Sequence, residues 1–514
     1  MHFHSKDLLH INEHKQSIQK IQQDLKHFST GFPKLEIFSP ATLADGILKI
    51  NSEEKQDLIN TYKQADVNVL KFVPASGAAS RMFRLLHQFL DDFPKTELSF
   101  ESFIKQDEFK PLEDFFETVE QLPFYEELRQ ALKTKGIDVN ALPKSQKAIE
   151  LTQQMLSENG FDMGRLPKGL FPFHNYAEKV LSAFEEHVYE ALNYAQKKNK
   201  IRLHFTISPE HLSEFQCKLN EIQPQLEKET DVDINVEFSF QHSSTDTICL
   251  DSKNEIFRDK DGKILFRPAG HGALIENLSR LDADLIFIKN VDNVCHRGAI
   301  SRYNIPSLDY KHVLAGLLIQ LQNKTFSLIE QLKASPNDDS LHQESASFLK
   351  TKLNNYAEFN TTADILKHLN KPLRVCGMVI NEGAPGGGPF WIKNEDGTLS
   401  LQIVEKSQID LSLPDQKAKM QASTHFNPVD IACSFKNHKG ENFDLQEFVD
   451  PTKGFIATKF VGGKSVKALE LPGLWNGGMA FWNTVFVEVP SESFTPVKTV
   501  LDLVKPNHQL QHDV

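Results

Sequence analysis

The chain has 514 residues, enough for two or three domains or for one large domain with insertions. With 40% hydrophobic and 25% charged residues, its composition is that of a globular protein and excludes a collagen-like or disordered chain. The formal net charge of -12 argues against a nucleic-acid partner, which requires a basic surface, whereas a few local cations suffice for one nucleotide.

The five cysteines are scattered and include no Cys-x-x-Cys pair, so neither a zinc knuckle nor a disulfide framework is indicated. The N-terminal residues lack the apolar core of a signal peptide. No run approaches the ~20 apolar residues of a membrane span. We therefore expect a cytoplasmic protein without a membrane partner, and the oligomeric state is left open.

The first half of the chain alternates between predicted helices and strands. Residues 1–65 are polar with apolar residues at helical spacing, and they predict a helical N-terminal region. The apolar run 69–73 predicts a buried strand, and a phenylalanine-rich, acidic stretch then predicts a helical insertion at about 90–160. Alternating patterns predict strands over 201–207 and 234–240, with a helix between them. This order indicates crossover units and a largely parallel sheet.

The second half continues the same type of fold. A second helical insertion is predicted at about 305–370, and strands resume at 374–380, 400–404 and 484–489. The sequence thus predicts an α/β fold with a mixed, mostly parallel central sheet flanked by helices. We place this α/β domain at residues 66–505, followed by a tail at 506–514.

A turn of small residues follows the first predicted strand and closes on Arg81. Small side chains let backbone N–H groups approach phosphate oxygens, and a guanidinium offers donors matched to phosphate. The competing interpretation is an ordinary strand-to-helix turn, and the turn is not a P-loop, since no Gly-Lys-Ser/Thr follows. The residues that we expect at a nucleotide are Ala75, Ser76, Gly77, Ala78, Ala79 and Ser80.

Two further segments suit phosphate and metal. Lys168 stands between a proline and a glycine, which would hold its charge in one place, although a solvent-facing lysine has the same appearance. Asp292 follows the apolar run 285–288, and ligands of open α/β sheets bind beyond the carboxyl ends of strands. Asp292 is therefore a candidate metal ligand, with a helix N-cap as the alternative role.

A second small-residue turn contains Gly270, His271 and Gly272. Such a turn can lie flat against a nucleobase, so we expect these residues to bind a nucleotide. A lone histidine is more often a structural hydrogen-bonder than a catalyst, and His271 is therefore given a binding role only. Gln241 directly follows a predicted strand and is expected to face the cleft that binds the nucleotide.

Several candidates lie in the C-terminal half, and each alone also fits a structural role. A glycine loop that follows a strand includes Gly386 and Gly387 and suits a ligand. Asn427 and Asp430 offer a sugar contact or a second metal ligand. Isolated charges beside strands or turns are contributed by Glu405 and Lys498.

Taken in order, these motifs resemble the sugar nucleotidyltransferases, and within them the UDP-sugar pyrophosphorylase branch. That branch carries a Gly-Gly-x-Gly-Thr-Arg-Leu turn, a Pro-Lys-Gly-Met element, a glycine-rich uridine loop, a Val-Asp-Asn, a Gln-Val-Val-Glu-Tyr-Ser and a Phe-Ser-Pro-x-Lys-Asn. The corresponding segments of this chain are 76–82, 167–170, 268–273, 291–293, 402–407 and 494–499. Beyond about residue 60, the chain also resembles an uncharacterised bacterial family of unknown function.

The resemblance implies a nucleotide-diphospho-sugar transferase fold of the GT-A type and transfer of a nucleotidyl group from UTP to a sugar 1-phosphate. It implies that Arg81, Lys168 and Lys498 neutralise phosphate charge. Asp292 would hold Mg²⁺, with help from Asp430. The implied contacts to the sugar substrate come from Asn293, Gly386, Gly387, Glu405 and Asn427.

Two departures leave the activity open. Ser76 and Ala79 stand where the enzymes carry glycine, and about eighty residues separate Arg81 from Pro167 where the enzymes have a short loop. One alternative is a nucleotide or nucleotide-sugar binder without transfer activity. The other is a metal-dependent glycosyltransferase, whose nucleotide-sugar donor contains no triphosphate for Arg81 and Lys168 to bind.

Overall fold

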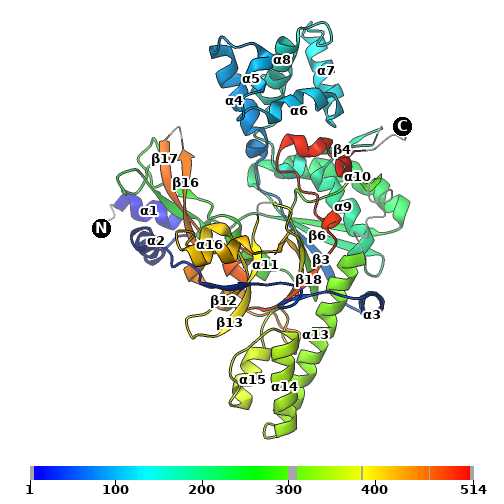
Figure 1. Ribbon diagram of the computed structural model, residues 1–514, viewed down its shortest axis with the longest axis vertical. Helices are drawn as coiled ribbons and strands as arrows, with labels where there is room; N and C mark the ends of the chain where they lie inside the picture. The colour runs from blue at the N-terminus through cyan, green and yellow to red at the C-terminus, as the bar shows by residue number, and fades with distance from the viewer. Residues whose placement is uncertain (1–4, 177, 299–308, 384–385, 462–463, 510–514) are drawn as a thin grey trace. The chain divides into compact units, whose positions relative to one another are not determined.

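The computed structural model describes residues 5–176, 178–298, 309–383, 386–461 and 464–509. The chain forms two compact units, each assembled from segments that are distant in sequence (Figure 1). The first unit comprises Met1–Phe72, Glu237–Lys289 and Asp309–Ser491, and the second comprises Val73–Val236, Asn290–Leu308 and Glu492–Val514.

A mixed sheet with strand order β2-β18-β11-β15-β10-β3 is the centre of the first unit. Neighbouring strands are parallel in the β2–β18, β18–β11 and β10–β3 pairs, whereas β15 runs antiparallel to both β11 and β10. The bounds are Ile47–Leu48 for β2, Asn483–Glu488 for β18, Leu373–Ile380 for β11, Asp430–Ser434 for β15, Leu285–Lys289 for β10 and Val69–Pro74 for β3.

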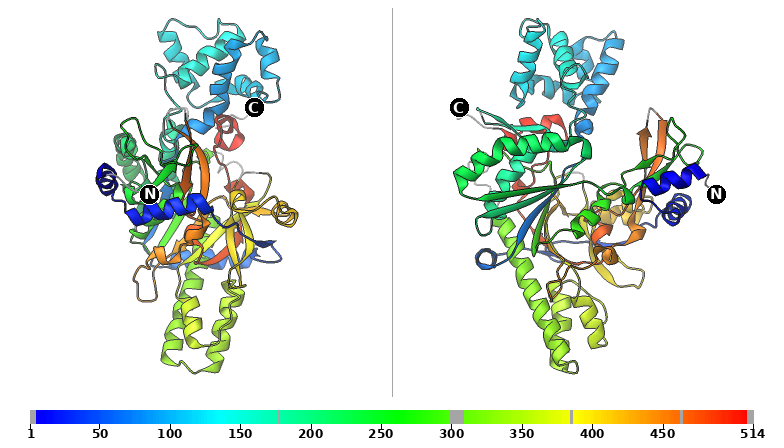
Figure 2. Two further views of the ribbon diagram at one scale, coloured as in Figure 1. Left: turned by 90° about the vertical axis from the view of Figure 1, so that its left-hand side faces the viewer. Right: turned by 180° about the vertical axis from the view of Figure 1, so that it is seen from behind.

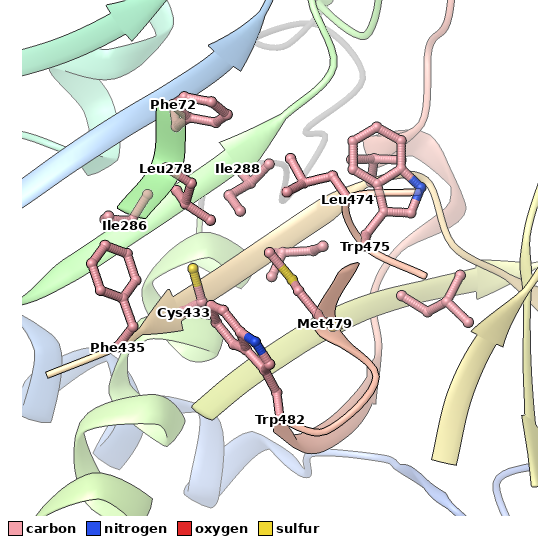
Figure 3. Close-up of a cluster of buried hydrophobic side chains, with 14 of the residues drawn as sticks. Phe72, Leu278, Ile286, Ile288, Cys433, Phe435, Leu474, Trp475, Met479 and Trp482 are labelled. Atoms are coloured by element: carbon pink, nitrogen blue, oxygen red, sulfur yellow. The ribbon is translucent and has the colours of Figure 1, made fainter. Parts of the chain in front are cut away.

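The central strands are largely apolar because both faces of the sheet are covered. Every residue of β10 and β15 is buried, as is almost all of β11. Ile286 and Ile288 of β10 pack with Cys433 of β15 and with Trp482 in one hydrophobic core, and Figure 3 shows these side chains around a common centre. Burial of this apolar area is the main favourable contribution to the stability of the unit.

Two smaller sheets and the helices complete the first unit. One sheet has the order β1-β12-β13 and the other β16-β17-β8-β9. The strands of the first of these sheets are β1 Ile37–Pro40, β12 Gly388–Lys393 and β13 Leu399–Val404. The strands of the second are β16 Phe455–Val461, β17 Lys464–Glu470, β8 Thr247–Leu250 and β9 Phe266–Arg267. A further short strand, β14, is His425–Phe426. The helices are α1 Ser5–Glu13, α2 Ile18–Thr30, α3 Ser52–Gln64, α11 Ile275–Ser279, α13 Asp309–Ala334, α14 Asp339–Lys352, α15 Thr362–Leu369 and α16 Pro414–Gln421.

The second unit combines strands and helices with a separate helical subregion. Its strands are β4 Pro172–Asn175, β5 Val180–Ser182, β6 Lys200–Thr206 and β7 Asp233–Ser239, the last ending in the first unit. The helices α9 Ala183–Tyr194 and α10 Leu212–Thr230 belong to this part. The subregion contains α4 Arg84–Asp92, α5 Phe100–Ile104, α6 Pro111–Thr118, α7 Tyr125–Thr134 and α8 Lys144–Leu156, seen together in Figure 2.

The phenylalanines of the helical subregion explain why it folds. Phe89 on α4 contacts the rings of Phe93, Phe100, Phe103 and Phe116 at centroid distances of 5.3–6.2 Å. Edge-to-face and stacked rings of this kind provide a small aromatic core. The stretch predicted as a helical insertion is therefore a packed subregion with its own hydrophobic centre.

The predicted α/β class and mixed, largely parallel central sheet are confirmed. The predicted strands correspond to β3, β6, β7, β11, β13 and β18. The described part of the N-terminal region, residues 5–65, contains α1, α2 and α3 but also β1 and β2, which join two different sheets. The domain boundaries stay predictions. Within the described ranges, helices of a length and apolarity that would cross a membrane are absent.

Candidate functional site

The small-residue turn and the Lys168 loop pair with one another in the second unit. Ala79 donates its amide to Leu166 O at 2.9 Å, Lys168 donates its amide to Gly77 O at 2.9 Å, and Ala78 forms a β-bridge with Pro167. Two segments that lie about ninety residues apart in sequence are thus joined by backbone hydrogen bonds. The motifs that the sequence pointed to are neighbours in space.

The turn itself leaves its backbone accessible. Ser76, Gly77, Ala78 and Ser80 are exposed, whereas Ala75 and Ala79 are buried and anchor the turn. No residue of the turn has a positive φ. The replacement of glycine by Ser76 and Ala79 therefore introduces no backbone strain, which removes the objection that the sequence raised.

A carboxylate with two ammonium groups forms the centre of the candidate site. Asp292 Oδ2 accepts from Lys168 Nζ at 2.7 Å and from Lys498 Nζ at 2.9 Å. Lys168 Nζ also donates to Val497 O at 2.8 Å. Two predicted phosphate-binding lysines and the predicted metal ligand, all more than a hundred residues from one another in sequence, thus meet at one oxygen atom.

Backbone contacts fix this arrangement. The segment that carries Lys498 is held by the Val497 amide, which donates to Asp292 O at 2.9 Å. The Thr495 amide donates to Asn293 Oδ1 at 2.9 Å, so the side chain of Asn293 holds this segment in place. The predicted sugar contact of Asn293 stays a prediction, and the structure assigns its amide oxygen a local role.

Burial and charge set the ionisation of the group. Burial alone would raise the pKa of Asp292, but Lys498 and Lys168 outweigh it and hold this pKa below its ordinary value. The pKa of Lys168 is lowered by burial, while Asp292 opposes this shift and the cations Lys498 and Arg81 add to it. Arg81 therefore lies close enough to act on Lys168 electrostatically, and the cluster holds three cations against one carboxylate.

Asp292 offers one atom to a metal. Its Oδ1 is buried and has no hydrogen-bond partner among the described residues. Across those residues, no group of three or more His, Cys, Asp or Glu side chains is arranged to hold a metal ion. Mg²⁺ is commonly bound by one or two carboxylates together with substrate phosphates and water, so a single free carboxylate oxygen fits an ion that arrives with a nucleotide.

Asp430 lies in the first unit and is completely buried. Lys311 of α13 forms an ion pair with it, and Tyr310 donates a hydrogen bond to its carboxylate. Lys311 neutralises the Asp430 carboxylate, and the hydrogen bond from Tyr310 occupies one of its oxygen atoms. Its proposed role as a second metal ligand stays a prediction, and the observed contacts give it a structural role between α13 and β15.

The first unit gathers most of the other predicted residues around a second cluster. Asn427 donates its amide to Gly387 O at 2.8 Å, and Gly387 packs against Glu405. Gly270 packs against the carboxylate of Glu470, and Glu470 is near enough to Glu405 to raise its pKa, to which burial contributes most. The predicted sugar-contacting and base-contacting residues of this unit thus lie together.

The histidine of the second turn is neutral and fixed. His271 stacks on Trp475 with centroids 4.3 Å apart, and its Nδ1 accepts from the Leu474 amide at 3.0 Å. Burial lowers the pKa of His271 to about 4, so its Nε2 carries the proton at neutral pH. Gln241, by contrast, donates to Asp246 Oδ1 at 3.2 Å.

Two residues of this cluster were missed from the sequence. Asn476 donates to Ile403 O at 2.8 Å, and its Oδ1 is buried without a hydrogen-bond partner in the described part of the chain. Glu470 ends β17, directly before a turn rich in glycine and proline. A polar residue within a glycine-rich turn is the signal that could have identified Asn476, and a carboxylate that ends a strand directly before this turn is the one for Glu470.

Comparison with known proteins shows the family of the chain. The sequence profile described as Domain of unknown function (DUF4301) matches residues 4–509, and the chain belongs to this family. A search of the curated proteins finds no match.

Among solved structures, the chain is similar to UDP-glucose pyrophosphorylase from Leishmania major, with 12% identity, a TM-score of 0.44, and coverage of 97% of this chain and 77% of that chain. A variant of that enzyme in complex with UDP-glucose gives the same values. The similarity to UDP-glucose phosphorylase from Trypanosoma brucei has 12% identity and a TM-score of 0.42, over 95% of this chain and 74% of that chain.

Proposed function

We propose that the protein is a nucleotidyltransferase that joins a sugar 1-phosphate to a nucleoside triphosphate, with UTP favoured, and releases pyrophosphate. The observation that carries the proposal is the meeting of Lys168 and Lys498 at Asp292, beside the accessible turn that leads to Arg81. A polyphosphate is the ligand that suits three convergent cations and exposed backbone amides. The order of the motifs in the sequence supports the same reaction.

In this reaction, an oxygen of the sugar 1-phosphate forms a bond to the α-phosphorus of the nucleotide. The bond from this phosphorus to the bridging oxygen of the β-phosphate breaks, and pyrophosphate leaves with the electron pair. Negative charge grows on the phosphoryl oxygens and on the leaving group. The ammonium groups of Lys168 and Lys498 and the guanidinium of Arg81 stabilise this charge, so that positioning and electrostatics supply most of the catalysis.

The fold itself holds the two lysines together. Asp292 accepts from both ammonium groups, so part of their rotamer freedom is lost on folding rather than on ligand binding. Phosphate oxygens then compete with Asp292 for them. Asp292 Oδ1 is the candidate ligand for Mg²⁺, which would neutralise phosphate charge when bound.

The residues of the first unit are proposed to bind the base and the sugar. Glu405 and Asn427 offer an acceptor and a donor suited to sugar hydroxyl groups, and the turn of Gly270, His271 and Gly272 is the candidate for contact with the base. The cytoplasmic location expected from the sequence belongs to this proposal.

The test is a coupled assay of pyrophosphate release with UTP, Mg²⁺ and a panel of sugar 1-phosphates. We expect turnover in the wild type and its loss in Arg81→Ala. Because Arg81 is exposed, the thermal midpoint of this variant should stay within a few degrees of the wild type. Lys133→Ala, an exposed lysine on α7, is the matched control and should keep full activity.

Two outcomes would contradict the role of Arg81, and a third would contradict the transfer itself. Full activity of Arg81→Ala would remove this residue from the site, and an unfolded variant would give it a structural role instead. Mg²⁺-dependent binding of UTP without turnover on any sugar phosphate would indicate a nucleotide-binding protein without transfer activity.

A further inference from the structure

Arg374, on β11 of the first unit, is a completely buried arginine in an otherwise apolar strand. Cys433 lies opposite Arg374 in the sheet, and Cys376 follows it on the same face of β11, both within the hydrophobic core. Within the described part of the chain, no carboxylate forms an ion pair with Arg374. A buried charge without a carboxylate partner is costly, and an apolar side chain would avoid this cost. What distinguishes the arginine from an apolar residue is its set of hydrogen bonds.

The guanidinium of Arg374 connects the central sheet to a turn. Its Nε donates to Thr484 Oγ1, on the neighbouring strand β18, at 2.9 Å, and its Nη1 donates to Trp475 O at 2.6 Å. Nη2 is buried and has no hydrogen-bond partner among the described residues. One bond therefore stays within the sheet, and the other fixes the backbone of the segment 472–479, which we call the 472–479 turn.

The 472–479 turn packs against both groups of residues that are proposed to bind the nucleotide. On one side, Trp475 stacks on His271 with centroids 4.3 Å apart. On the other side, a Cβ at Gly387 would lie 3.5 Å from Asn476 Nδ2 and 3.5 Å from Glu405 Cγ. The turn thus lies between the candidate base contact and the candidate sugar contacts, and its position sets the spacing between them.

Close packing leaves the turn little freedom to adjust by itself. A Cβ at Gly473 would lie 2.6 Å from Asn476 Oδ1 and 2.8 Å from His271 Cε1. Leu474, Trp475 and Met479 belong to the hydrophobic core of the first unit, where Figure 3 shows them. A shift of the backbone at Trp475 would therefore displace Asn476 and the ring that stacks on His271 together.

We propose that Arg374 is a positioning residue for nucleotide binding: its hydrogen bond to Trp475 O fixes the 472–479 turn, and this turn holds His271 and the sugar-contacting residues at the correct spacing. The inference rests on the proposed function for the identity of the ligand. Arg374 touches no ligand itself, because its side chain is completely buried. Its effect should therefore appear in the affinity for the nucleotide and not in the chemical step.

Two matched substitutions each remove one of the two hydrogen bonds. In Arg374→Gln, Nε2 occupies the same place along the side chain as the arginine Nε, so it can donate to Thr484 but is too short to reach Trp475 O. In Thr484→Val, the bond within the sheet is lost and the bond to Trp475 O remains. A difference between the two variants therefore reports on the bond to the turn.

Hydrogen–deuterium exchange of peptides covering residues 471–480 measures how firmly the turn is held, and it needs no substrate. The amides of Leu474, Asn476 and Gly478 donate hydrogen bonds in the folded protein, so the wild type should protect them. In Arg374→Gln, protection should fall about ten- to hundredfold, which is the equilibrium effect of one hydrogen bond from a charged donor. In Thr484→Val, protection should stay within about twofold of the wild type.

Addition of UTP with Mg²⁺ tests whether the turn belongs to the nucleotide site. If opening of the turn abolishes binding, UTP at about ten times its Kd should raise the protection of the wild-type peptide about tenfold. In assays of pyrophosphate release, the KM for UTP should rise about two- to tenfold in Arg374→Gln, while kcat changes less than about twofold. Thr484→Val should keep both constants.

Four results would overturn the inference. They are wild-type protection in Arg374→Gln, an equal loss of protection in the two variants, protection of the turn that UTP does not change, and a KM for UTP that Arg374→Gln leaves unchanged. If Arg374→Gln does not fold, Arg374→Met replaces it, because methionine ends at the position of the arginine Nε and has no donor. The same loss of protection is then expected.

The exchange experiment also separates this inference from the proposed function. If UTP protects the turn and only Arg374→Gln loses protection, but no sugar phosphate supports turnover, Arg374 positions a bound nucleotide and the nucleotidyl transfer falls. If turnover is found and both variants exchange like the wild type, the transfer stands and the role of Arg374 falls.

Discussion

Each unit contains a turn of small residues, at 75–80 in the second unit and at 270–272 in the first. The surroundings of the glycines differ between the two turns. In the second unit, a Cβ at Gly77 would meet no atom within 4 Å, and the residue has no positive φ. In the first unit, Gly270 has a φ of 80° and packs against Glu470, and a Cβ at Gly272 would overlap the carbonyl oxygen of Pro472. The protein itself requires the glycines of the first unit, whereas the open turn of the second unit leaves room for a ligand.

The two units also differ in the sign of the charged groups at their predicted sites. The second unit places Lys168 and Lys498 at Asp292, with Arg81 near enough to act on Lys168, whereas the first unit places Glu405 near Glu470. Cations suit phosphate, and carboxylates suit hydroxyl or amide donors. The comparison therefore predicts that changes in the second unit affect catalysis more than folding, and that changes in the first unit affect folding first.

The largest expected effect is that of Lys498→Ala. Removing one cation that stabilises transition-state charge should lower the turnover number by about 10² to 10³, by analogy with removed oxyanion donors. The side chain is 42% exposed, so the free energy of unfolding should change by about 0–1 kcal/mol. Lys505→Ala, in the same segment with a side chain 65% exposed, is the control for rates of pyrophosphate release. Equal rates in the two variants would remove Lys498 from the site.

The second effect is on stability and concerns Gly272→Ala. The added methyl group would overlap Pro472 O and approach Leu471 O, so the backbone must move. Overpacking of this kind costs about 1–3 kcal/mol, which chemical denaturation can measure. A variant as stable as the wild type would show that the backbone of this turn can move at little cost in stability. The two turns would then not differ in their need for glycine.

A third, smaller effect concerns pH. Burial, with a contribution from Glu470, holds the pKa of Glu405 above its ordinary value in the folded state. Glu405 therefore binds a proton more tightly when folded, and its contribution to stability is present at low pH and is lost as pH rises through the folded pKa. Glu405→Gln should flatten the decrease in stability above about pH 4.5, measured by urea denaturation at a series of pH values. An unchanged slope would show that Glu405 titrates normally.

The sequence predicted the central strands and the cationic site because both depend on strong local signals. Short apolar runs such as 285–288, which turn residues follow, favour buried strands, and Lys168 and Asp292 stand directly beside turn residues. The prediction missed the hairpin of β16 and β17, whose side chains are half-buried and whose lysines weaken the apolar alternation. Pairing between distant strands, as in β17 with β8, has no local sequence signal.

The same limit applies to the sites. The sequence indicated Glu405, Gly270 and Gly387 separately, but only the fold brings Glu470 to Gly270 and near Glu405, and Asn476 to Gly387. Likewise, Arg374 is a single polar residue at the start of an apolar run, and its hydrogen bond to Trp475 O joins two segments that lie 101 residues apart in sequence. The buried ion pair between Asp430 and Lys311 could not be predicted either, because Lys311 lies within a helix more than a hundred residues earlier in the sequence.

The smallest expected effect on stability is that of Gly77→Ala, and it tests the comparison most sharply. An open site with negative φ accepts a methyl group, and the free energy of unfolding should stay within about 0.5 kcal/mol of the wild type or rise slightly. If phosphate approaches this backbone closely, however, the methyl group will obstruct it, and the KM for UTP should rise while the thermal midpoint does not move. A variant with unchanged stability and unchanged KM would mean that the turn is open without serving a ligand, and that the cations around Asp292 bind phosphate without it.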